Sequence, residues 1–276
     1  MSMTYRELRL WLRQELSDRE NLDQEIRWLI EAFSGKNFLD IGPEEEVSRP
    51  VFYEKAVKRL QHHEPFQYVV GSQEFYGGVF LVTPAVLVPR PETELLVEEA
   101  LRWAKGRDAL EILDLCTGSG CIGISLARET ESPVLAIDIS EDALKVAEKN
   151  NALNGTAVDF RYSDLFYHIP KERTFDLITA NPPYLTQQEM KEIPLEVTHE
   201  PWIALDGGPN GLFAIERILK ELDQRLNPGG LFLMEIGEGQ GNVTLALAEK
   251  YDLPGAKILK DLNEKDRIFC WEKKSE

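Results

Sequence analysis

The stretch Glu111-Ile-Leu-Asp-Leu-Cys-Thr-Gly-Ser-Gly120 decides the fold of this chain. Its first half is an apolar run of strand length, and its second half is a glycine-containing loop that leads into helical sequence. Glycines at 118 and 120 permit positive φ and allow the backbone to approach a ligand closely. The helix that follows offers free N–H groups at its N-terminus. The stretch therefore predicts a strand–loop–helix unit that binds a small ligand.

Segments of helix and strand character alternate after residue 92. The helices are expected at residues 93–103, 122–129, 141–151, 212–226 and 242–250, and the strands at 111–115, 134–138, 158–162, 175–179, 230–236 and 268–271. This alternation predicts an α/β fold, a doubly wound and mostly parallel sheet with helices on both faces. Such sheets bind ligands at the carboxyl ends of their central strands.

The N-terminal region has a different character. Apolar residues recur at helical spacing in three segments, which predicts a small helical bundle over residues 5–16, 25–33 and 51–60. Aromatic and β-branched residues then predict a linking β-hairpin over residues 74–82 and 85–88. We expect three parts: a helical domain at 1–72, a hairpin linker at 73–88 and a ligand-binding α/β domain at 89–276.

Composition limits the possible functions. The 276 residues are 43% hydrophobic, which is typical of a globular protein, and no apolar run reaches the length of a membrane span. The N-terminus resembles neither a signal nor a transit peptide. With 31 basic and 48 acidic residues the formal charge is −17, which disfavours a grip on phosphates. Three scattered cysteines indicate a reducing compartment, so we expect a cytoplasmic protein.

No metal site is expected. His62, His63 and Glu64 are adjacent, but no further ligand lies near them in the sequence, and a solvated helix end explains them.

The ligand of the loop has two candidates. Residues 118–123 match the pattern GxGxxG, which in a dehydrogenase holds a pyrophosphate. Asp114 beside the loop would oppose a pyrophosphate but suits the ammonium group of a methionine moiety. Asp138, at the end of the next strand, can accept both hydroxyls of a ribose in either case. Asp114 thus favours S-adenosylmethionine over a dinucleotide, although a loop-bracing role for this carboxylate is an alternative.

A second pair of candidates follows the third strand. Asp164 is expected to accept from an adenine amine, and Phe166 to lie against the adenine ring. An ordinary loop with an N-cap aspartate explains the same residues.

Asn181-Pro-Pro-Tyr184 is the sharpest chemical signal in the chain. The two prolines fix φ near −65° and hold the preceding residue extended, so the turn is rigid. The Asn181 side-chain oxygen and the Pro182 carbonyl, held by Pro183, can accept the two hydrogens of a planar NH₂ group. Tyr184 can stack on the face of that group. The pattern predicts transfer to an amide or amine nitrogen, although a merely stiff turn is the alternative.

Together these motifs resemble amino-group methyltransferases that use S-adenosylmethionine. More specific matches point to the release-factor glutamine methyltransferases, the PrmC/HemK family. The blocks that carry this resemblance are Glu64-Pro-Phe-Gln-Tyr68 with Gly71 and Glu74-Phe-Tyr76, Val88-Pro-Arg-Pro-Glu-Thr-Glu94, Glu200-Pro, Ala204-Leu205, Gly207-Gly208 with Gly211-Leu212, Asp261-Leu262 and Asp266-Arg267. They span residues 64–271, and the helical N-terminus agrees in size and character.

The resemblance implies a seven-stranded, Rossmann-like methyltransferase sheet. It also implies methylation of the side-chain amide nitrogen (N5) of the glutamine in the Gly-Gly-Gln motif of peptide chain release factors, with substrate recognition by the helical domain at 1–72 and catalysis by an S-adenosylmethionine-dependent methyltransferase domain at 89–276. We further expect a monomer that does not bind nucleic acid directly. The cofactor would contact Asp114, Cys116, Thr117, Gly118, Ser119, Gly120, Asp138, Asp164, Phe166 and Asn181, with Arg90, Glu92 and Thr93 on the cofactor side of the cleft. Cys116 is a departure, because family members often have glycine there.

Three other functions stay open at the level of sequence. A nucleic-acid adenine N6-methyltransferase would share the Asn181 chemistry, but the negative charge opposes it. An NAD-dependent oxidoreductase would explain the glycine pattern but not the Asn181 turn. A non-catalytic protein that binds the cofactor as a regulator would not need Asn181 and Tyr184.

Overall fold

The computed structural model describes residues 3–275, which form two compact units. The first unit comprises residues 3–72 together with 194–199, and the second comprises residues 73–193 and 200–275. Within residues 3–275 we find no helix with the length and hydropathy needed to cross a bilayer.

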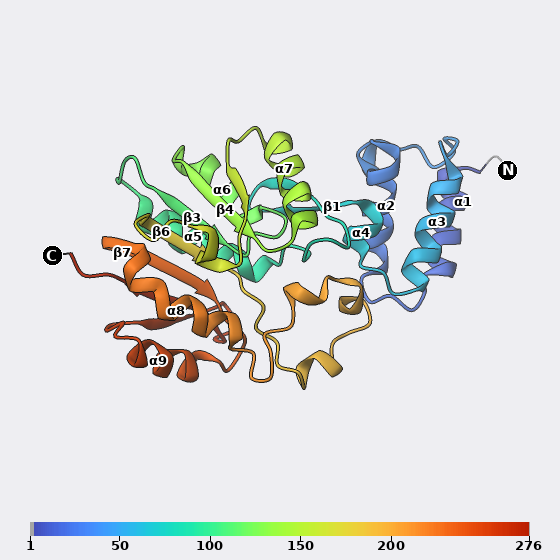
Figure 1. The fold of residues 1–276 in the computed structure, drawn as a ribbon. Coiled ribbons are helices and arrows are strands. Elements are labelled where there is room, and N and C mark those ends of the chain that lie inside the picture. Colours follow the sequence, from blue (N-terminus) through green and yellow to red (C-terminus); the bar gives the residue numbers. More distant parts are fainter. Residues whose placement is uncertain (1–2, 276) are drawn as a thin grey trace. The chain divides into compact units, whose positions relative to one another are not determined.

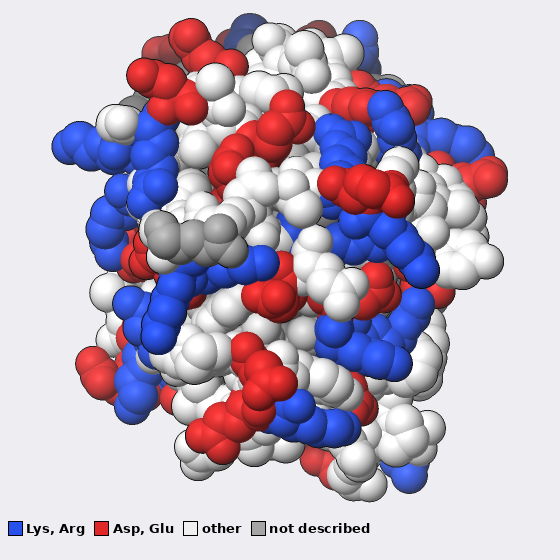
Figure 2. Space-filling model, turned by 60° about the vertical axis from the view of Figure 1, so that its left-hand side comes forward, with Lys and Arg blue, Asp and Glu red and all other residues white. Residues whose placement is uncertain are grey.

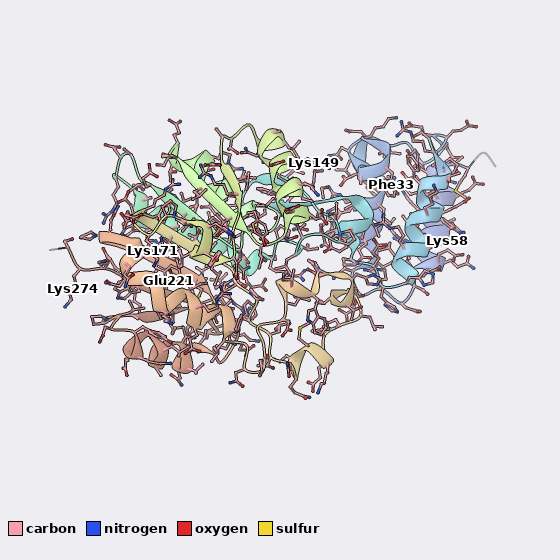
Figure 3. All side chains as sticks on the ribbon, viewed as in Figure 1. Phe33, Lys58, Lys149, Lys171, Glu221 and Lys274 are labelled. Atoms are coloured by element: carbon pink, nitrogen blue, oxygen red, sulfur yellow. The ribbon has the colours of Figure 1, made fainter. Side chains whose placement is uncertain are left out.

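The first unit is a helical bundle. Its α-helices are α1 (Tyr5–Glu15), α2 (Leu22–Ser34), α3 (Pro50–Gln61) and α4 (Phe66–Val70). Thr4 begins α1 with a capping box, because its hydroxyl accepts from the N–H of Glu7 while the Glu7 carboxylate accepts from the N–H of Thr4. Phe33, labelled in Figure 3, packs edge-on against Tyr53 with ring centroids 5.3 Å apart. The predicted helical bundle is confirmed.

A seven-stranded sheet forms the centre of the second unit. Its strands are β3 (Ile112–Leu115), β4 (Val134–Asp138), β5 (Asp159–Tyr162), β6 (Phe175–Ala180), β7 (Leu226–Glu235), β8 (Lys257–Lys260) and β9 (Asp266–Glu272), in the order β5-β4-β3-β6-β7-β9-β8. The five strands from β5 to β7 run parallel, and β9 is antiparallel to both of its neighbours. The predicted mostly parallel sheet is confirmed.

Helices cover both faces of this sheet (Figure 1). Helices α5 (Glu94–Ala104), α6 (Cys121–Thr130) and α7 (Glu141–Asn154) lie on one face, and α8 (Phe213–Arg225) and α9 (Gly241–Lys250) lie on the other. Successive strand residues face opposite sides. Ile112 accordingly packs in the cluster beneath α5 and α6, while Leu113 packs in the cluster beneath α8. Both faces are buried, which explains why the central strands are mostly apolar.

One local prediction was wrong, and two short elements were not predicted. The hairpin exists, but its strands are β1 (Ser72–Phe75) and β2 (Gly78–Leu81), so residues 85–88 form a turn and loop instead of a strand. Helix α4 was missed because its aromatic and β-branched sequence favours strands. Strand β8 was missed because it is a short edge strand with a lysine at each end.

A buried amide ties the hairpin to the sheet domain. The Asn150 side chain on α7 has no exposed surface; it accepts from the Leu81 N–H (2.7 Å) and donates to the carbonyls of Leu81 (3.0 Å) and Ser119 (2.9 Å). This one residue therefore joins β2, α7 and the glycine loop.

We expect Asn150→Ala to lower the free energy of unfolding by about 2–3 kcal/mol, because it leaves several partly buried backbone groups without partners. Urea titration followed by circular dichroism would measure the change. Asn263→Ala, at an exposed turn, serves as the control and should stay within about 0.5 kcal/mol of the parent protein. Equal losses in the two variants would contradict this role for Asn150.

Candidate active site

A cavity of about 520 Å³ opens at the carboxyl ends of β3, β4 and β6. Of the residues singled out from the sequence, it is lined by Arg90, Thr93, Cys116, Thr117, Gly118, Ser119, Asp138, Asp164, Asn181 and Pro183. Asp114, Gly120, Phe166, Pro182 and Tyr184 are not in its lining. The structure thus brings most of the candidates to one cavity at the place expected for a doubly wound sheet.

Asp114 lies behind the cavity wall. Its side chain is fully buried; one carboxylate oxygen accepts from the Thr117 hydroxyl (2.6 Å) and the Gly123 N–H (3.2 Å), and the other accepts from the Thr179 hydroxyl (2.8 Å). Burial raises the pKa of Asp114 to about 6. Asp114 therefore braces the loop through three hydrogen bonds. The expected direct contact with a ligand ammonium group stays a prediction, because a carboxylate has about four acceptor positions.

The loop after β3 depends on unusual backbone angles. Cys116 has a φ of 57° and Gly120 has a φ of 83°. A Cβ at Gly120 would lie 2.9 Å from Ile124, so this glycine serves close packing and does not line the cavity. Cys116 does line it, and burial raises the pKa of its thiol well above the usual value. The thiol is therefore protonated and unreactive at neutral pH.

Asp138 ends β4 at the cavity. Its two oxygens accept from the N–H groups of Gly118 (2.8 Å) and Ser140 (2.9 Å). Burial raises the pKa of this carboxyl, and hydrogen bonds from the backbone of Gly118, Ser140 and Ile139 oppose that shift. A carboxylate has about four acceptor positions, so the group retains capacity for the two hydroxyls of a ribose.

The loop after β5 places its residues differently from expectation. Asp164 lines the cavity, but its carboxylate is held by the Arg217 guanidinium through two hydrogen bonds of 2.9 Å. Phe166 is only 1% exposed and packs in the core beneath the Arg225 guanidinium. Leu165, whose φ of 50° turns the backbone, takes the place at the cavity wall that we expected for Phe166.

The turn after β6 presents two oxygens without protein partners. Asn181 lines the cavity, and neither its side-chain oxygen nor the Pro182 carbonyl accepts a hydrogen bond from another residue in the described range 3–275. Pro182 itself is buried, and Pro183 contributes to the lining. Among the described residues, both predicted acceptors are therefore free of protein hydrogen bonds, and of the two residues only Asn181 belongs to the cavity lining.

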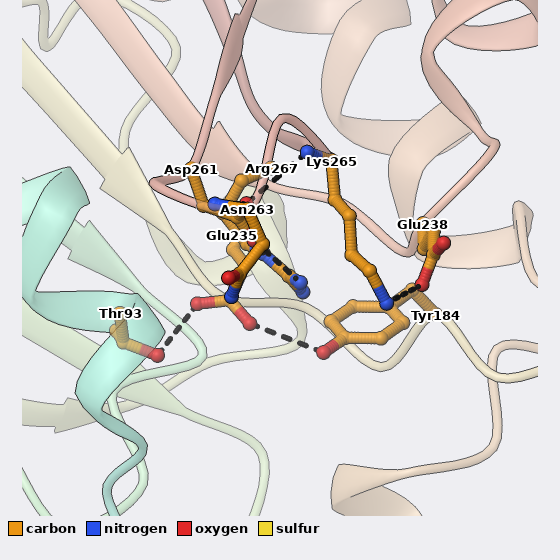
Figure 4. Close-up of polar contacts among 8 residues, drawn as sticks. All are labelled: Thr93, Tyr184, Glu235, Glu238, Asp261, Asn263, Lys265 and Arg267. Atoms are coloured by element: carbon orange, nitrogen blue, oxygen red, sulfur yellow. Dashed lines mark hydrogen bonds and ion pairs between the residues drawn. The ribbon is translucent and has the colours of Figure 1, made fainter.

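Tyr184 is fixed at both ends. Its hydroxyl donates to Glu235 at 3.1 Å (Figure 4). Its backbone carbonyl accepts from the Gln240 side chain at 2.9 Å. Gly211, with a φ of 69°, lies so close that a Cβ would come within 2.2 Å of the Tyr184 carbonyl oxygen. The glycine at 211 is thus needed for the backbone of the turn to fit.

Two buried carboxylates near the site were given no role from the sequence: Glu235 was not singled out, and Glu200 was quoted only for the family resemblance. Glu235, at the end of β7, accepts from Tyr184 and from the Thr93 hydroxyl (2.6 Å). Glu200 accepts from the Val88 N–H (3.0 Å) and from Arg90, which lines the cavity. Glu92, by contrast, is exposed and outside the lining. A lone glutamate within the apolar run 230–236 was the available signal for Glu235.

Comparison with known proteins identifies the family. Residues 7–71 match the family description PrmC N-terminal domain, and residues 91–200 match Methyltransferase small domain. A release factor glutamine methyltransferase of Geobacter sulfurreducens is 36% identical over 276 residues, which cover 96% of this chain and 95% of the relative. This chain belongs to the release factor glutamine methyltransferase family. Its Koribacter versatilis relative of the same name is 43% identical, covering 78% of this chain and 79% of that protein.

Solved structures of other methyltransferases share the fold of this chain. A Thermus thermophilus 16S rRNA methyltransferase in complex with AdoMet and guanosine has a TM-score of 0.56 at 21% identity, covering 74% of this chain and 50% of that one. A methyltransferase from Pyrococcus furiosus has a TM-score of 0.54 at 18% identity, covering 81% and 96%. At such identities the likeness shows the fold alone. The predicted Rossmann-like methyltransferase sheet is confirmed.

The brace formed by Asp114 can be tested through pH. Its pKa is about 3.9 in an unfolded chain and about 6 here, so the folded state binds the proton more tightly. The free energy of unfolding therefore falls as pH rises from about 4 to 6, by up to about 3 kcal/mol for this group. We expect Asp114→Asn, which can satisfy the same three partners, to lose this part of the pH dependence. Denaturation at several pH values measures it.

The same variant separates the brace from a direct ligand role. With a brace, the dissociation constant for S-adenosylmethionine should change less than about threefold on Asp114→Asn, as calorimetry would show. An increase of about a hundredfold with unchanged stability would contradict the brace and support the direct ammonium contact.

Proposed function

We propose that this protein methylates the side-chain amide nitrogen (N5) of the glutamine in the Gly-Gly-Gln motif of peptide chain release factors. The observation that carries the proposal is a pair of acceptors without protein partners in residues 3–275: the side-chain oxygen of Asn181, which lines the cavity, and the carbonyl of the next residue, Pro182. A primary amide offers two coplanar N–H donors, and this pair matches them. The names of the relatives supply the substrate class.

The cofactor is S-adenosyl-L-methionine, which supplies an electrophilic methyl group and leaves as S-adenosyl-L-homocysteine. The residues present fit it. Asp138 retains acceptor capacity for the ribose hydroxyls, and Ile139 and Leu165 give the cavity an apolar wall suited to an adenine ring. The loop at Thr117–Ser119 and the side chains of Arg90 and Thr93 would surround the methionine end.

The Asn181 turn would act on the nucleophile. An amide nitrogen is poorly nucleophilic because its lone pair is delocalised into the carbonyl. Two acceptors on its hydrogens draw electron density toward nitrogen and fix its lone pair toward the methyl group. With the cofactor bound, the N–C bond would form as the S–C bond breaks, and the methylated nitrogen would release its proton to solvent. Orientation of this kind can contribute up to about 7–11 kcal/mol.

Tyr184 would close one side of the amide site. Burial and the neighbouring negative charge of Glu235 raise the pKa of its phenol, so the hydroxyl stays protonated and donates to that carboxylate. We propose that its ring lies against the planar amide, as expected from the sequence.

The helical first unit is proposed to help recognise the release factor. It contains the match to the PrmC N-terminal domain and has its own core of buried apolar side chains. The free thiols of Cys116, Cys121 and Cys270 suit a reducing cytoplasm, the proposed location.

An adenine N6 group could occupy the same acceptor pair, so a nucleic-acid substrate is the second candidate. The formal charge of −17 opposes it. On the face drawn in Figure 2, basic and acidic side chains are interspersed and do not form one basic stripe. These observations favour a protein substrate.

Mass spectrometry of a release factor incubated with the enzyme and S-adenosylmethionine tests the substrate. We expect the mass of one methyl group to be added to the peptide that contains the Gly-Gly-Gln motif. A release factor with that glutamine changed to alanine should stay unmodified. Equal labelling of both proteins would reject the assignment.

Asn181→Ala tests the acceptor pair. Loss of one preorganised hydrogen-bond partner should lower kcat by about 100- to 1000-fold. The dissociation constant for S-adenosylmethionine should change far less, since the lost contact is to the substrate amide. Asn263→Ala serves as the matched control, because it is the same substitution at an exposed turn that is distant in sequence from Asn181. Unchanged kcat in Asn181→Ala would refute the acceptor role.

A further inference from the structure

Glu235 joins two parts of the active-site cleft that are far apart in sequence. It is the last residue of β7, the strand beside β6, and the pairing of Ala180 with Met234 places it level with Asn181. One carboxylate oxygen accepts from the Thr93 hydroxyl, 142 residues away, and the other accepts from the Tyr184 hydroxyl, 51 residues away. Figure 4 shows the carboxylate between these two side chains.

This carboxylate is costly to keep. Glu235 is 2% exposed, and burial raises its pKa. The positive charge of Arg267 offsets part of that shift, although the Arg267 guanidinium is itself hydrogen-bonded to Asp261 at 3.1 Å and lies behind the site. An apolar side chain of similar volume would avoid the desolvation of a charge. Stability alone therefore gives no reason for a glutamate here.

One partner of Glu235 lines the cavity, and the other adjoins a turn that does. Thr93 lines the cavity on the side of Arg90, and Tyr184 follows directly on the rigid turn that presents Asn181. With Gln240 holding its carbonyl, Tyr184 is anchored at both ends. Any movement of its ring passes to the Pro182 carbonyl through the stiff proline backbone.

We propose that Glu235 is a positioning residue for methyl transfer, which fixes the distance between the Asn181–Tyr184 turn and the cofactor side of the cleft by accepting from Tyr184 and Thr93 together. The inference rests on the proposed function, because it needs an amide held at Asn181. In this role Glu235 holds Tyr184 and Thr93 in place and does not need to contact the substrate.

Three variants test the proposal in the full-length protein. Glu235→Ala should lower kcat by about 10- to 100-fold, because misplacement of about 1 Å costs that much in transfer reactions. Its dissociation constant for S-adenosylmethionine should stay within about threefold of the parent value. Glu235→Gln should recover activity to within about fivefold, since its oxygen can accept from Tyr184 and its amide can donate to the Thr93 hydroxyl. Tyr184→Phe removes the same hydrogen bond from the other side.

The double variant Glu235→Ala/Tyr184→Phe shows whether the two residues act together. If Glu235 works through Tyr184, the combined loss in kcat will be smaller than the product of the two single losses. Leu222→Ala is the control for stability alone, because Leu222 is a buried residue of α8 without a polar contact to the turn. The kcat of Leu222→Ala, calculated per folded molecule, should equal that of the parent protein.

Two results would overturn the proposal. One is a kcat for Glu235→Ala equal to that of Leu222→Ala, and the other is full multiplication of the single losses in the double variant. If the parent protein leaves the release factor unmodified, the proposed function fails separately. A crystal structure of Glu235→Ala then still decides the positioning role, which is refuted if the Tyr184 ring and Thr93 keep their places.

Discussion

The buried carboxylate of Asp114 is the interaction on which the ligand cavity depends. It sits at the end of the central strand and holds, through three hydrogen bonds, the glycine loop, the first turn of α6 and the neighbouring strand β6. Each of these elements contributes to a wall of the cavity or to the turn beside it. A buried charge is tolerated only where it is hydrogen-bonded. Asp114 therefore requires its three partners in place, and the same partners shape the cavity.

Two further buried carboxylates extend the same principle. Glu200 holds Arg90 and the backbone at Val88, and Glu235 holds Thr93 and Tyr184. The three acids thus fix the loop, the segment before α5 and the Asn181 turn against a sheet whose strands end at one edge. The oxygens left without protein partners at that edge, on Asn181 and Pro182, are those that suit an amide NH₂. Some of the acidic residues of this chain therefore stabilise the interior of the fold, while others lie on the surface.

Much of the fold could be predicted because it depends on patterns among residues that are close together in the sequence. Apolar runs gave the parallel strands, helical periodicity gave the covering helices and the N-terminal bundle, and the cavity-lining loop and turn followed from glycine and proline. Strand β8 and helix α4 escaped because their sequences are too short or too ambiguous for periodicity to decide. The order β5-β4-β3-β6-β7-β9-β8 rests on contacts between distant segments and had no local signal.

The sequence by itself determined the α/β class, the glycine loop, the rigid Asn-Pro-Pro-Tyr turn and the family to which the chain belongs. All of these rest on residues adjacent in the chain, where backbone sterics and periodicity act. Only the tertiary structure decided that Asp114 faces inward, that Phe166 belongs to the core and that Glu235 reaches both Thr93 and Tyr184. Those facts depend on which strands become neighbours and on which side chains lose their water, and both are set when the whole sheet packs.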